Sequence, residues 1–382
     1  MTAIIGGGIG GLTLALALHH FGRTAPVYEA SPEPGEVGAG IWVSPNAMQV
    51  FERLNLASAI MASGYELGAI ELLDYDESRL QFMDLAPFKQ KYGHGIIAIK
   101  RAELLAILSR AYEERTGQAI AYGHKCNKIM AQARSATAVF DNGVSVESDC
   151  LIGADGIRSA VRRHLIPSVH PEYTGQTSWR RIVHGELPEK WRRTSVEIWG
   201  KGRRFGFSYI GEGQVYWYAT CDRPAMLLSH SSDAEPVDLL QIFSEFPDYV
   251  RNLINDNAGA AIRTDIYDLP VLTKWYEGSI ALLGDAAHAT SPNMGQGGAQ
   301  AVEDGYVLAE ALTACDSLSA AFARYQNNRH DKARTIVRKS RVFGRLAHLK
   351  SGPGRAFRNA FIKLAPASVS MREWDEVYRL NF

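Results

Sequence analysis

Residues 6–11, with the sequence GGGIGG, have the composition of a turn that binds phosphate groups. They contain the pattern GxGxxG at Gly6, Gly8 and Gly11. One glycine of this pattern permits a tight turn, one lets a pyrophosphate approach the backbone, and one lets a helix pack closely on a strand. The segment therefore predicts a dinucleotide site, in which the phosphates face the free N–H groups of the helix that follows.

An acidic residue lies at the distance from this turn that is expected for contact with a ribose. Glu29 directly follows the expected second strand, 25–28, which completes a short βαβ unit. A carboxylate at this position can bind both hydroxyls of a ribose, and it disfavours a 2′-phosphate. The dinucleotide is therefore expected to be FAD or NAD rather than NADP.

A second glycine-rich segment, 283–298, has the sequence LGDAAHATSPNMGQGG. Asp285 lies at the carboxyl end of an expected buried strand, 279–283, and the glycines open an expected helix, 297–312. Asp285 is placed to accept hydrogen bonds from a polyol chain, and the helix N-terminus can stabilise an anion. Because a reduced flavin is anionic around its pyrimidine edge, this segment favours a flavin.

A third glycine-flanked aspartate, Asp155, ends another expected buried strand, 150–153. A helix begins just behind it, with arginines in its first turns. On its own, Asp155 is explained more simply as a helix N-cap than as a ligand. Asp155 becomes a candidate ligand only in combination with the glycine-rich segments 6–11 and 283–298.

The expected elements place these sites on an α/β sheet. Helices are expected at 10–21 and 102–116, the second after a strand at 95–99. From Thr177 to Asp222 the chain is rich in aromatic and β-branched residues, which predicts an antiparallel sheet in a second domain.

Bulk composition narrows the class of protein. The 382 residues include 41 basic and 41 acidic side chains, so no basic excess points to nucleic acid. The four cysteines form no CxxC pair, which suits a reducing compartment and gives no thiolate metal site. No apolar run approaches the roughly 20 residues of a membrane span. We expect a cytoplasmic protein with no metal.

The motifs GGGIGG with Glu29, GADGIRSAVR and GDAAHATSPNMGQGGAQAVED, in that order, resemble the class A flavoprotein aromatic hydroxylases, which have the fold of para-hydroxybenzoate hydroxylase. The resemblance covers nearly the whole chain. Within that family, the segments TGQTSWR (174–180), EIWG (197–200) and VYWYAT (215–220) are similar to the branch that contains FAD-dependent urate hydroxylases and 2-alkyl-4-quinolone 3-hydroxylases.

The resemblance implies a Rossmann-like FAD-binding domain interleaved with an antiparallel-sheet substrate domain and followed by a helical tail. The implied boundaries are 1–70, 96–172 and 268–340 for the FAD-binding domain, 71–95 and 173–267 for the substrate domain, and 341–382 for the tail. The implied FAD-binding residues are Gly6, Gly8, Ile9, Gly10, Gly11, Glu29, Ala30, Arg101, Asp155, Gly156, Gly284, Asp285, Pro292, Gly295, Gly297 and Gly298.

The implied activity is that of a single-component flavin monooxygenase. NADH or NADPH reduces FAD, O2 adds to the reduced ring, and the resulting C4a-hydroperoxide hydroxylates an aromatic or N-heteroaromatic small molecule. Pro292 lies where the flavin ring would sit, and Arg204 and Tyr216 match positions that line the substrate pocket in the urate hydroxylase branch. A monomer or a homodimer is expected.

Alternating aromatics in the expected sheet predict a floor for a planar ligand. Phe205, Phe207 and Tyr209 share one face of a strand, and Tyr216 and Tyr218 do so on its neighbour. Burial in the core explains any single one of them equally well.

Some alternatives stay open at this point. An isoprenoid epoxidase or reductase of the same fold, or a flavin-binding regulator without turnover, would carry the same cofactor motifs. The tail after Ser317 is helical and basic in pattern, with an expected break at 352–354. Such a stretch can lie on an anionic membrane surface, although packing against its own domain or a partner subunit is the commoner arrangement.

Overall fold

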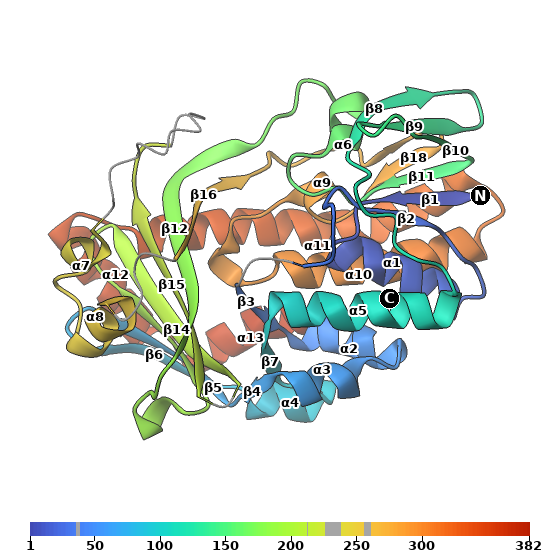
Figure 1. The fold of residues 1–382 in the computed structure, drawn as a ribbon. Coiled ribbons are helices and arrows are strands. Elements are labelled where there is room, and N and C mark those ends of the chain that lie inside the picture. The colour runs from blue at the N-terminus through green and yellow to red at the C-terminus, as the bar shows by residue number, and fades with distance from the viewer. Residues whose placement is uncertain (36–38, 212, 226–237, 256–260) are drawn as a thin grey trace.

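The computed structural model describes residues 1–35, 39–211, 213–225, 238–255 and 261–382. A five-stranded sheet lies at one end of the molecule and a seven-stranded sheet at the other, with long helices running between them (Figure 1). The chain enters the seven-stranded sheet twice, at 69–84 and at 172–268, so the two halves are interleaved. This confirms the expected fold class.

The five-stranded sheet is built on the N-terminal strand β1 (Thr2–Ile5). On its two sides β1 pairs in parallel with β11 (Cys150–Gly153) and β2 (Val27–Tyr28). Beyond β11 lie the parallel β18 (Ile280–Leu282) and the antiparallel β17 (Tyr276–Glu277). All residues of β1 and β11 are buried, as expected for strands of a parallel sheet that is covered on both faces.

Helices α1 (Ile9–His20) and α10 (Gly297–Ala314) pack tightly against each other beside this sheet. Their close approach requires Gly305, because a Cβ there would lie 2.8 Å from the backbone nitrogen of Leu14. The sequence predicted both helices to within two residues at each end, and it predicted α5 (Arg101–Thr116) one residue late.

Two three-stranded sheets and several short helices complete this half of the protein. One sheet has the order β10-β9-β8 and the other β3-β7-β4. Their strands are β8 (Cys126–Ala131), β9 (Ala136–Phe140), β10 (Ser145–Ser148), β3 (Gly40–Val43), β7 (Ile96–Lys100) and β4 (Tyr65–Leu67). The helices are α2 (Pro45–Arg53), α3 (Ala57–Ser63), α4 (Ala86–Tyr92), α6 (Ala160–Leu165) and α9 (Asp285–His288).

The seven-stranded sheet has the order β16-β12-β15-β14-β13-β5-β6. Neighbouring strands are antiparallel except β13 and β5, which pair in parallel. The strands are β16 (Ile262–Asp268), β12 (Glu172–His184), β15 (Gln214–Asp222), β14 (Arg203–Gly211), β13 (Thr194–Trp199), β5 (Ala69–Asp74) and β6 (Arg79–Asp84). Helices α7 (Leu239–Ile242) and α8 (Asp248–Asn255) pack against it.

The aromatic residues of β14 do not share a face with Tyr216 and Tyr218, so the floor predicted from the sequence is partly wrong. The register pairs Ser208 with Tyr216 and Phe207 with Trp217. Directly opposite residues point to the same side of a sheet. Phe205, Phe207 and Tyr209 therefore face away from Tyr216, where Phe205 and Phe207 are buried in a core with residues of α7 and α8.

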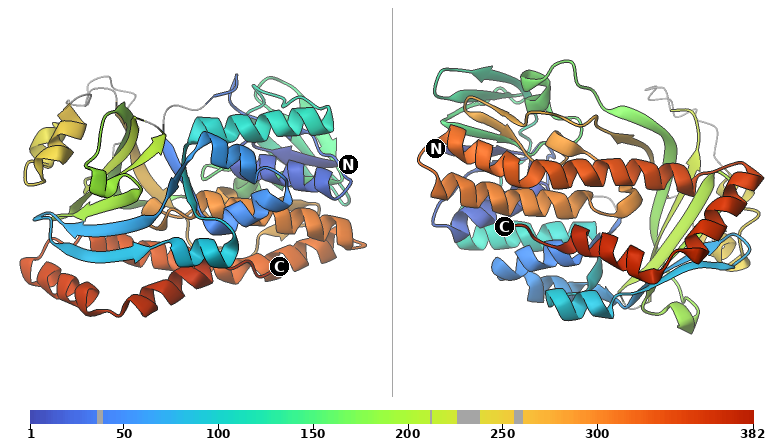
Figure 2. Two further views of the ribbon diagram at one scale, coloured as in Figure 1. Left: turned by 90° about the horizontal axis from the view of Figure 1, so that it is seen from below. Right: turned by 180° about the vertical axis from the view of Figure 1, so that it is seen from behind.

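From Leu318 onwards the chain forms a long helix followed by two shorter ones. Helix α11 (Leu318–Ala347) runs along both halves of the molecule, and α12 (Gly352–Leu364) and α13 (Ala367–Tyr378) fold back beside it (Figure 2). The domain boundary expected at 340/341 lies inside α11. The helical tail breaks at 348–351, directly before the expected 352–354, which form the first turn of α12. Within the described ranges, no helix combines the length and apolarity that a membrane crossing requires.

The core position of Phe207 gives a test of the sheet register. Its ring contacts those of Trp191 and Tyr249, with centroids 5.3 and 5.9 Å apart. We predict that Phe207→Ala lowers the free energy of unfolding by about 3–5 kcal/mol, measured by urea denaturation. Phe82→Ala is the matched control, because Phe82 is 47% exposed. Equal losses from both variants would contradict this placement.

Candidate active site

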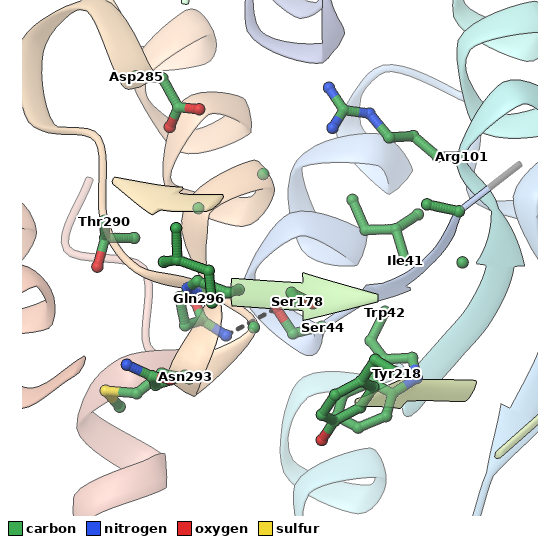
Figure 3. A pocket seen from close by; sticks show the side chains of 18 of the residues that line it. Ile41, Trp42, Ser44, Arg101, Ser178, Tyr218, Asp285, Thr290, Asn293 and Gln296 are labelled. Carbon is green, nitrogen blue, oxygen red and sulfur yellow. Dashed lines mark hydrogen bonds between the residues drawn. The ribbon is translucent and has the colours of Figure 1, made fainter. Parts of the chain in front are cut away.

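A cavity of about 840 Å³ is lined by residues of both halves of the protein (Figure 3). One part of its wall comes from the turn between β1 and α1, and another from the seven-stranded sheet. Strand β3, the segment 289–298 and helix α13 supply much of the remainder. The cavity is therefore large enough for a cofactor and a small ligand together.

The three glycines of the N-terminal pattern have different structural roles at one end of this cavity. Gly6 has a φ of +111°, and a Cβ on it would lie 2.3 Å from the carbonyl oxygen of Ala154. A Cβ on Gly11 would lie 2.0 Å from the carbonyl oxygen of Gly6. Gly8, by contrast, lines the cavity and has no atom within 4 Å of its Cβ position. Two of the glycines thus serve turn and packing, and the third leaves the backbone open to the cavity.

Glu29 is held beside this turn by backbone donors. Its carboxylate accepts hydrogen bonds from the N–H of Gly7 at 2.6 Å and from the N–H of Ser31 at 2.8 Å. Neither Glu29 nor the exposed Ala30 lines the cavity itself. The bond to Gly7 fixes the carboxylate against the glycine turn.

Asp285 and Arg101 extend into the cavity from opposite sides (Figure 3). Asp285 begins α9 and Arg101 begins α5. The enclosing walls raise the pKa of Asp285 by desolvation, against the positive charges of His288 and Arg101. Gly284 before it has a φ of +60° and sits against Ala301, which turns the chain out of β18.

A buried ionic cluster behind α9 fixes Asp285 in place. Asp304 of α10 accepts hydrogen bonds from the N–H of Gly284 at 3.0 Å, from His288 at 2.5 Å and from Arg329 at 2.8 Å. Burial alone would raise the pKa of Asp304, but His288 and Arg329 hold it at about 2. Asp304 therefore stays ionised and anchors the turn from which Asp285 projects.

Asp155 is placed as a helix cap, and its carboxylate does not line the cavity. It accepts hydrogen bonds from the N–H of Ala160 at 2.7 Å and from the hydroxyl of Ser159 at 2.5 Å, at the start of α6. The neighbouring Ala154 and Gly156 do line the cavity. This segment thus meets the cavity next to Asp155 rather than through its side chain.

The segment 289–298 wraps the cavity between the two halves. It contains the 3₁₀ turn η3 (Pro292–Met294), and Gly297 and Gly298 begin α10. The side-chain amide of Gln296 donates to the hydroxyl of Ser44 at 3.1 Å (Figure 3). It also accepts a hydrogen bond from Asn46 at 3.1 Å. These bonds attach the segment to the start of α2.

Tyr216 and Tyr218 form the floor of the cavity on the seven-stranded sheet. Both rings lie over glycines, because a Cβ on Gly40 would meet the ring of Tyr216 at 2.4 Å and one on Gly206 would meet Tyr218 at 2.2 Å. The hydroxyl of Tyr218 donates to Glu197. Burial, reinforced by the Glu197 charge, raises the pKa of Tyr218 well above its ordinary value, so the phenol stays protonated.

Arg204 also lines the cavity, and its donors are already engaged. The guanidinium donates to Thr220 at 3.1 Å, to Glu197 at 3.3 Å, and to the side-chain oxygen of Asn293. Asn293 is in turn held by α11, where its amide donates to the carbonyl oxygen of Ser340 at 2.9 Å. The buried cation therefore joins β14 to the 289–298 segment and to α11.

A buried histidine continues this network towards the surface. The hydroxyl of Thr220, which lines the cavity, hydrogen-bonds His348 at 3.0 Å, and the other ring nitrogen of His348 lies 2.7 Å from Asp222. Lys350 pairs with the second oxygen of Asp222 at 3.0 Å. Burial lowers the pKa of His348 below its ordinary value of 6.5, so the ring is neutral at neutral pH.

Sequence reasoning found the glycine turns, Asp285, Arg101, Arg204 and Tyr216, which the structure brings to one cavity. It missed Trp42 of β3, and it missed Glu197, Asn293 and His348, which surround Arg204. The small residues Gly206 and Ser208 alternate along β14 and could have indicated which face of the sheet holds the large side chains of the neighbouring strand. They lie opposite Tyr218 and Tyr216, and small side chains on one strand leave room for large ones on the next.

Comparison with known proteins supplies the family. The model for the FAD binding domain matches residues 1–340. The chain belongs to this FAD-binding family.

Named relatives agree with the match. Aurachin C monooxygenase/isomerase from Stigmatella aurantiaca is 39% identical over 90% of this chain and 88% of its own length. The 2-heptyl-3-hydroxy-4(1H)-quinolone synthase of Pseudomonas aeruginosa is 28% identical over 96% of this chain and 94% of its own. The structure of Klebsiella pneumoniae HpxO with FAD and uric acid has a TM-score of 0.88 at 28% identity, covering 99% and 96% of the two chains. The FAD-binding protein is thus an FAD-dependent monooxygenase, as the sequence predicted.

The lowered pKa of His348 makes a prediction for this monooxygenase. Below pH 6.5, His348 is protonated in the unfolded chain but still neutral in the folded chain. Because the unfolded state binds the extra proton, the free energy of unfolding falls as the pH drops from 6.5 towards the folded-state pKa. We predict that the pH dependence of the unfolding free energy is shallower in His348→Gln than in the wild type over this range, measured by urea denaturation between about pH 7.5 and 5. His20→Gln, at an exposed site, should leave the dependence unchanged. Parallel curves for wild type and His348→Gln would contradict the prediction.

Proposed function

We propose that this protein hydroxylates a planar aromatic or N-heteroaromatic small molecule, with NADH or NADPH as reductant and O2 as co-substrate. The observation that carries the proposal is the single cavity that has the glycine turn of β1 at one end and the floor of Tyr216, Tyr218 and Glu197 at the other. A dinucleotide in the first part would bring its flavin ring towards the second. The relatives named above support this proposal. One is named for the synthesis of a quinolone, and another has a structure in complex with FAD and uric acid, and both compounds are heteroaromatic.

The residues around the glycine turn fit FAD. The open backbone at Gly8 leaves space for a pyrophosphate, and the N-terminal ends of α1 and α10 both line the cavity. Two helix dipoles are therefore available, one for the phosphates and one for the anionic edge of a reduced flavin. We assign Glu29 to the ribose of the ADP half, and Arg101 and Asp285 to the phosphate and ribityl chain.

A bound FAD would supply the redox chemistry, in which NADH or NADPH provides a hydride and O2 gives one oxygen atom to the substrate and the other to water. The chain's own part is positioning and enclosure. Pro292 and Gly295–Gly298 would define where the ring edge can lie, and Trp42, Tyr216 and Met294 add aromatic and apolar surface to the lining. Exclusion of water favours transfer of oxygen to the substrate over its loss as hydrogen peroxide.

The engagement of Arg204 by protein groups favours a neutral substrate beside it. Arg204 is engaged by Glu197, Thr220 and Asn293, so this cation is committed to the protein rather than to a substrate carboxylate. Glu197 can accept a hydrogen bond from a substrate N–H or O–H. The lining of the same cavity also includes apolar and aromatic side chains, namely Ile70, Leu72, Met83, Ile96, Trp374 and Tyr378. We therefore infer an N-heteroaromatic ring with an apolar substituent.

The open backbone at Gly8 gives a test of FAD placement. A Cβ on Gly8 meets no protein atom, but it projects where the pyrophosphate is proposed to lie. We predict that Gly8→Ala keeps the unfolding midpoint of the apoprotein and weakens FAD affinity by about tenfold or more, measured by flavin fluorescence titration.

Gly352→Ala is the matched control for this variant. Gly352 also has no atom within 4 Å of its Cβ position, and it lies on α12 outside the cavity lining. Its FAD affinity should equal that of the wild type. An unchanged affinity in Gly8→Ala would show that the phosphates do not approach this residue.

The proposed activity predicts that the FAD-loaded protein oxidises NADH or NADPH faster when a suitable aromatic is added, and that the product gains one oxygen atom. A panel of alkylated quinolones, hydroxybenzoates, purines and hydroxypyridines tests this by O2 uptake and mass spectrometry with ¹⁸O2. We expect the greatest stimulation from the neutral quinolones.

Two tyrosine variants distinguish the effect of a change in the cavity from that of a change on the opposite face of the sheet. Tyr218→Phe removes the hydroxyl that donates to Glu197, and it should lower kcat/KM by about tenfold. Tyr209→Phe removes a hydroxyl that accepts from the N–H of Leu187 on the opposite face, and it should leave kcat/KM unchanged. Normal FAD content without stimulation by any compound would contradict the hydroxylase and favour a flavin-binding regulator.

A further inference from the structure

The chain has a strong asymmetry of charge along its length. The 41 residues from Lys332 to Arg372 contain 11 Lys and Arg and no Asp or Glu, so the rest of the chain has 11 more acidic than basic side chains. This segment covers the last half of α11, all of α12 and the start of α13. The overall neutrality of the protein therefore conceals one basic segment. Lys332, Arg341, Lys350 and Arg358 of this segment pair with carboxylates elsewhere in the fold, and others, such as Arg345 and Arg372, are exposed.

The same region exposes an unusual amount of apolar surface. Among the described residues, six of the eleven large hydrophobic side chains that are exposed lie between 342 and 369. Phe357, Phe361 and Leu364 of α12 are 76%, 68% and 82% exposed. Their spacing of four and three residues places them on one helix face, which Ala356 and Ala360 extend. The corner 364–369, with the sequence LAPASV, is exposed throughout.

The opposite face of α12 is firmly attached to the protein. Arg358 is buried, stacks 4.8 Å from the ring centroid of Trp199, and donates to the carbonyl oxygen of Leu346 at 3.1 Å. Asn359 donates to Asp74 at 2.5 Å, and Ile362 packs beside the apolar cluster around Trp199. The helix thus presents its apolar face to the outside in a fixed orientation, and we call Phe357, Phe361, Leu364 and Val369 the α12 patch.

We propose that the α12 patch docks the protein on an anionic phospholipid bilayer. Exposed phenylalanine and leucine side chains can enter the interfacial region, and the exposed Arg345, Lys363 and Arg372 complement anionic headgroups. The net acidity of the other faces repels such a surface, so the basic region determines the orientation. A symmetric dimer through the same patch would instead bring two basic segments together, which disfavours a second copy as the occupant.

Docking in this orientation has a consequence for the active site, which rests on the proposed function. Ser370 directly follows Val369, and Ser370, Trp374 and Tyr378 of α13 line the cavity. The wall of the cavity is therefore continuous in sequence with the docked corner. An apolar substrate that is dissolved in the bilayer would meet the protein at α13, close to its binding site.

Vesicle flotation with the full-length, FAD-loaded protein tests the proposal. We expect binding to vesicles of phosphatidylcholine with phosphatidylglycerol to be at least about tenfold tighter than binding to phosphatidylcholine alone. The triple variant Phe357→Ser, Phe361→Ser, Leu364→Ser should lose this binding while its FAD content and unfolding midpoint stay unchanged, because the three side chains are exposed. The variant Arg345→Glu, Lys363→Glu, Arg372→Glu should lose the preference for anionic vesicles.

The matched control removes the same number of exposed apolar side chains elsewhere. Met61→Ser, Met130→Ser, Val144→Ser changes residues that are 43%, 42% and 41% exposed outside the basic region, and it should bind vesicles like the wild type. Equal affinity for neutral and anionic vesicles, or none for either, would overturn the proposal. So would self-association in light scattering that the α12 triple variant abolishes without any vesicle binding. Because flotation reports location and not turnover, a failure of the proposed hydroxylation would appear separately, in the NAD(P)H oxidation assay.

Discussion

The structure depends on backbone segments that approach each other too closely for any side chain between them. Where β1 ends, Gly6 meets Ala154 and Gly11 meets Gly6, and a Cβ at either glycine would overlap a carbonyl oxygen. Further along, Gly10 lies against Leu283 and Ala301, and Gly305 lies against the start of α1. These contacts draw β11, α1 and α10 together at one point. The N-terminal ends of both helices therefore meet the same cavity, at the end proposed to bind FAD.

This constraint also explains what the sequence could predict. A glycine that must avoid an overlap is visible in the sequence, as is an aspartate that ends a buried strand, because each depends on a few neighbouring residues. Gly6, Gly11 and Asp285 were accordingly found without a structure, and Gly8, which avoids no overlap, was found because it belongs to the same pattern. Asp155 shows the limit of this logic, because the same pattern produced a cap for α6 whose carboxylate does not line the cavity.

The proposed substrate end of the cavity depends on pairing between distant segments, and local patterns do not specify it. Alternation along β14 shows that Phe205 and Phe207 share a face, but the register with β15 decides which face that is. Arg204 was identified as a lining residue, yet its partners Glu197, Thr220 and Asn293 come from three other elements. Helix α11 adds a further long-range connection. Arg329 near its start supports Asp304, and Ser340 and His348 near its end support Asn293 and Thr220.

The two faces of the seven-stranded sheet have different roles: one lines the cavity and the other packs in the hydrophobic core. On β14 and β15 the residues that line the cavity alternate with those that form the core beneath α7 and α8. Substitutions at the cavity positions change the chemistry that a ligand meets while the aromatic core on the other side stays intact. Selection can therefore alter ligand preference with little loss of foldability. This separation offers a physical reason why one scaffold has diversified towards compounds as different as uric acid and alkylated quinolones among its relatives.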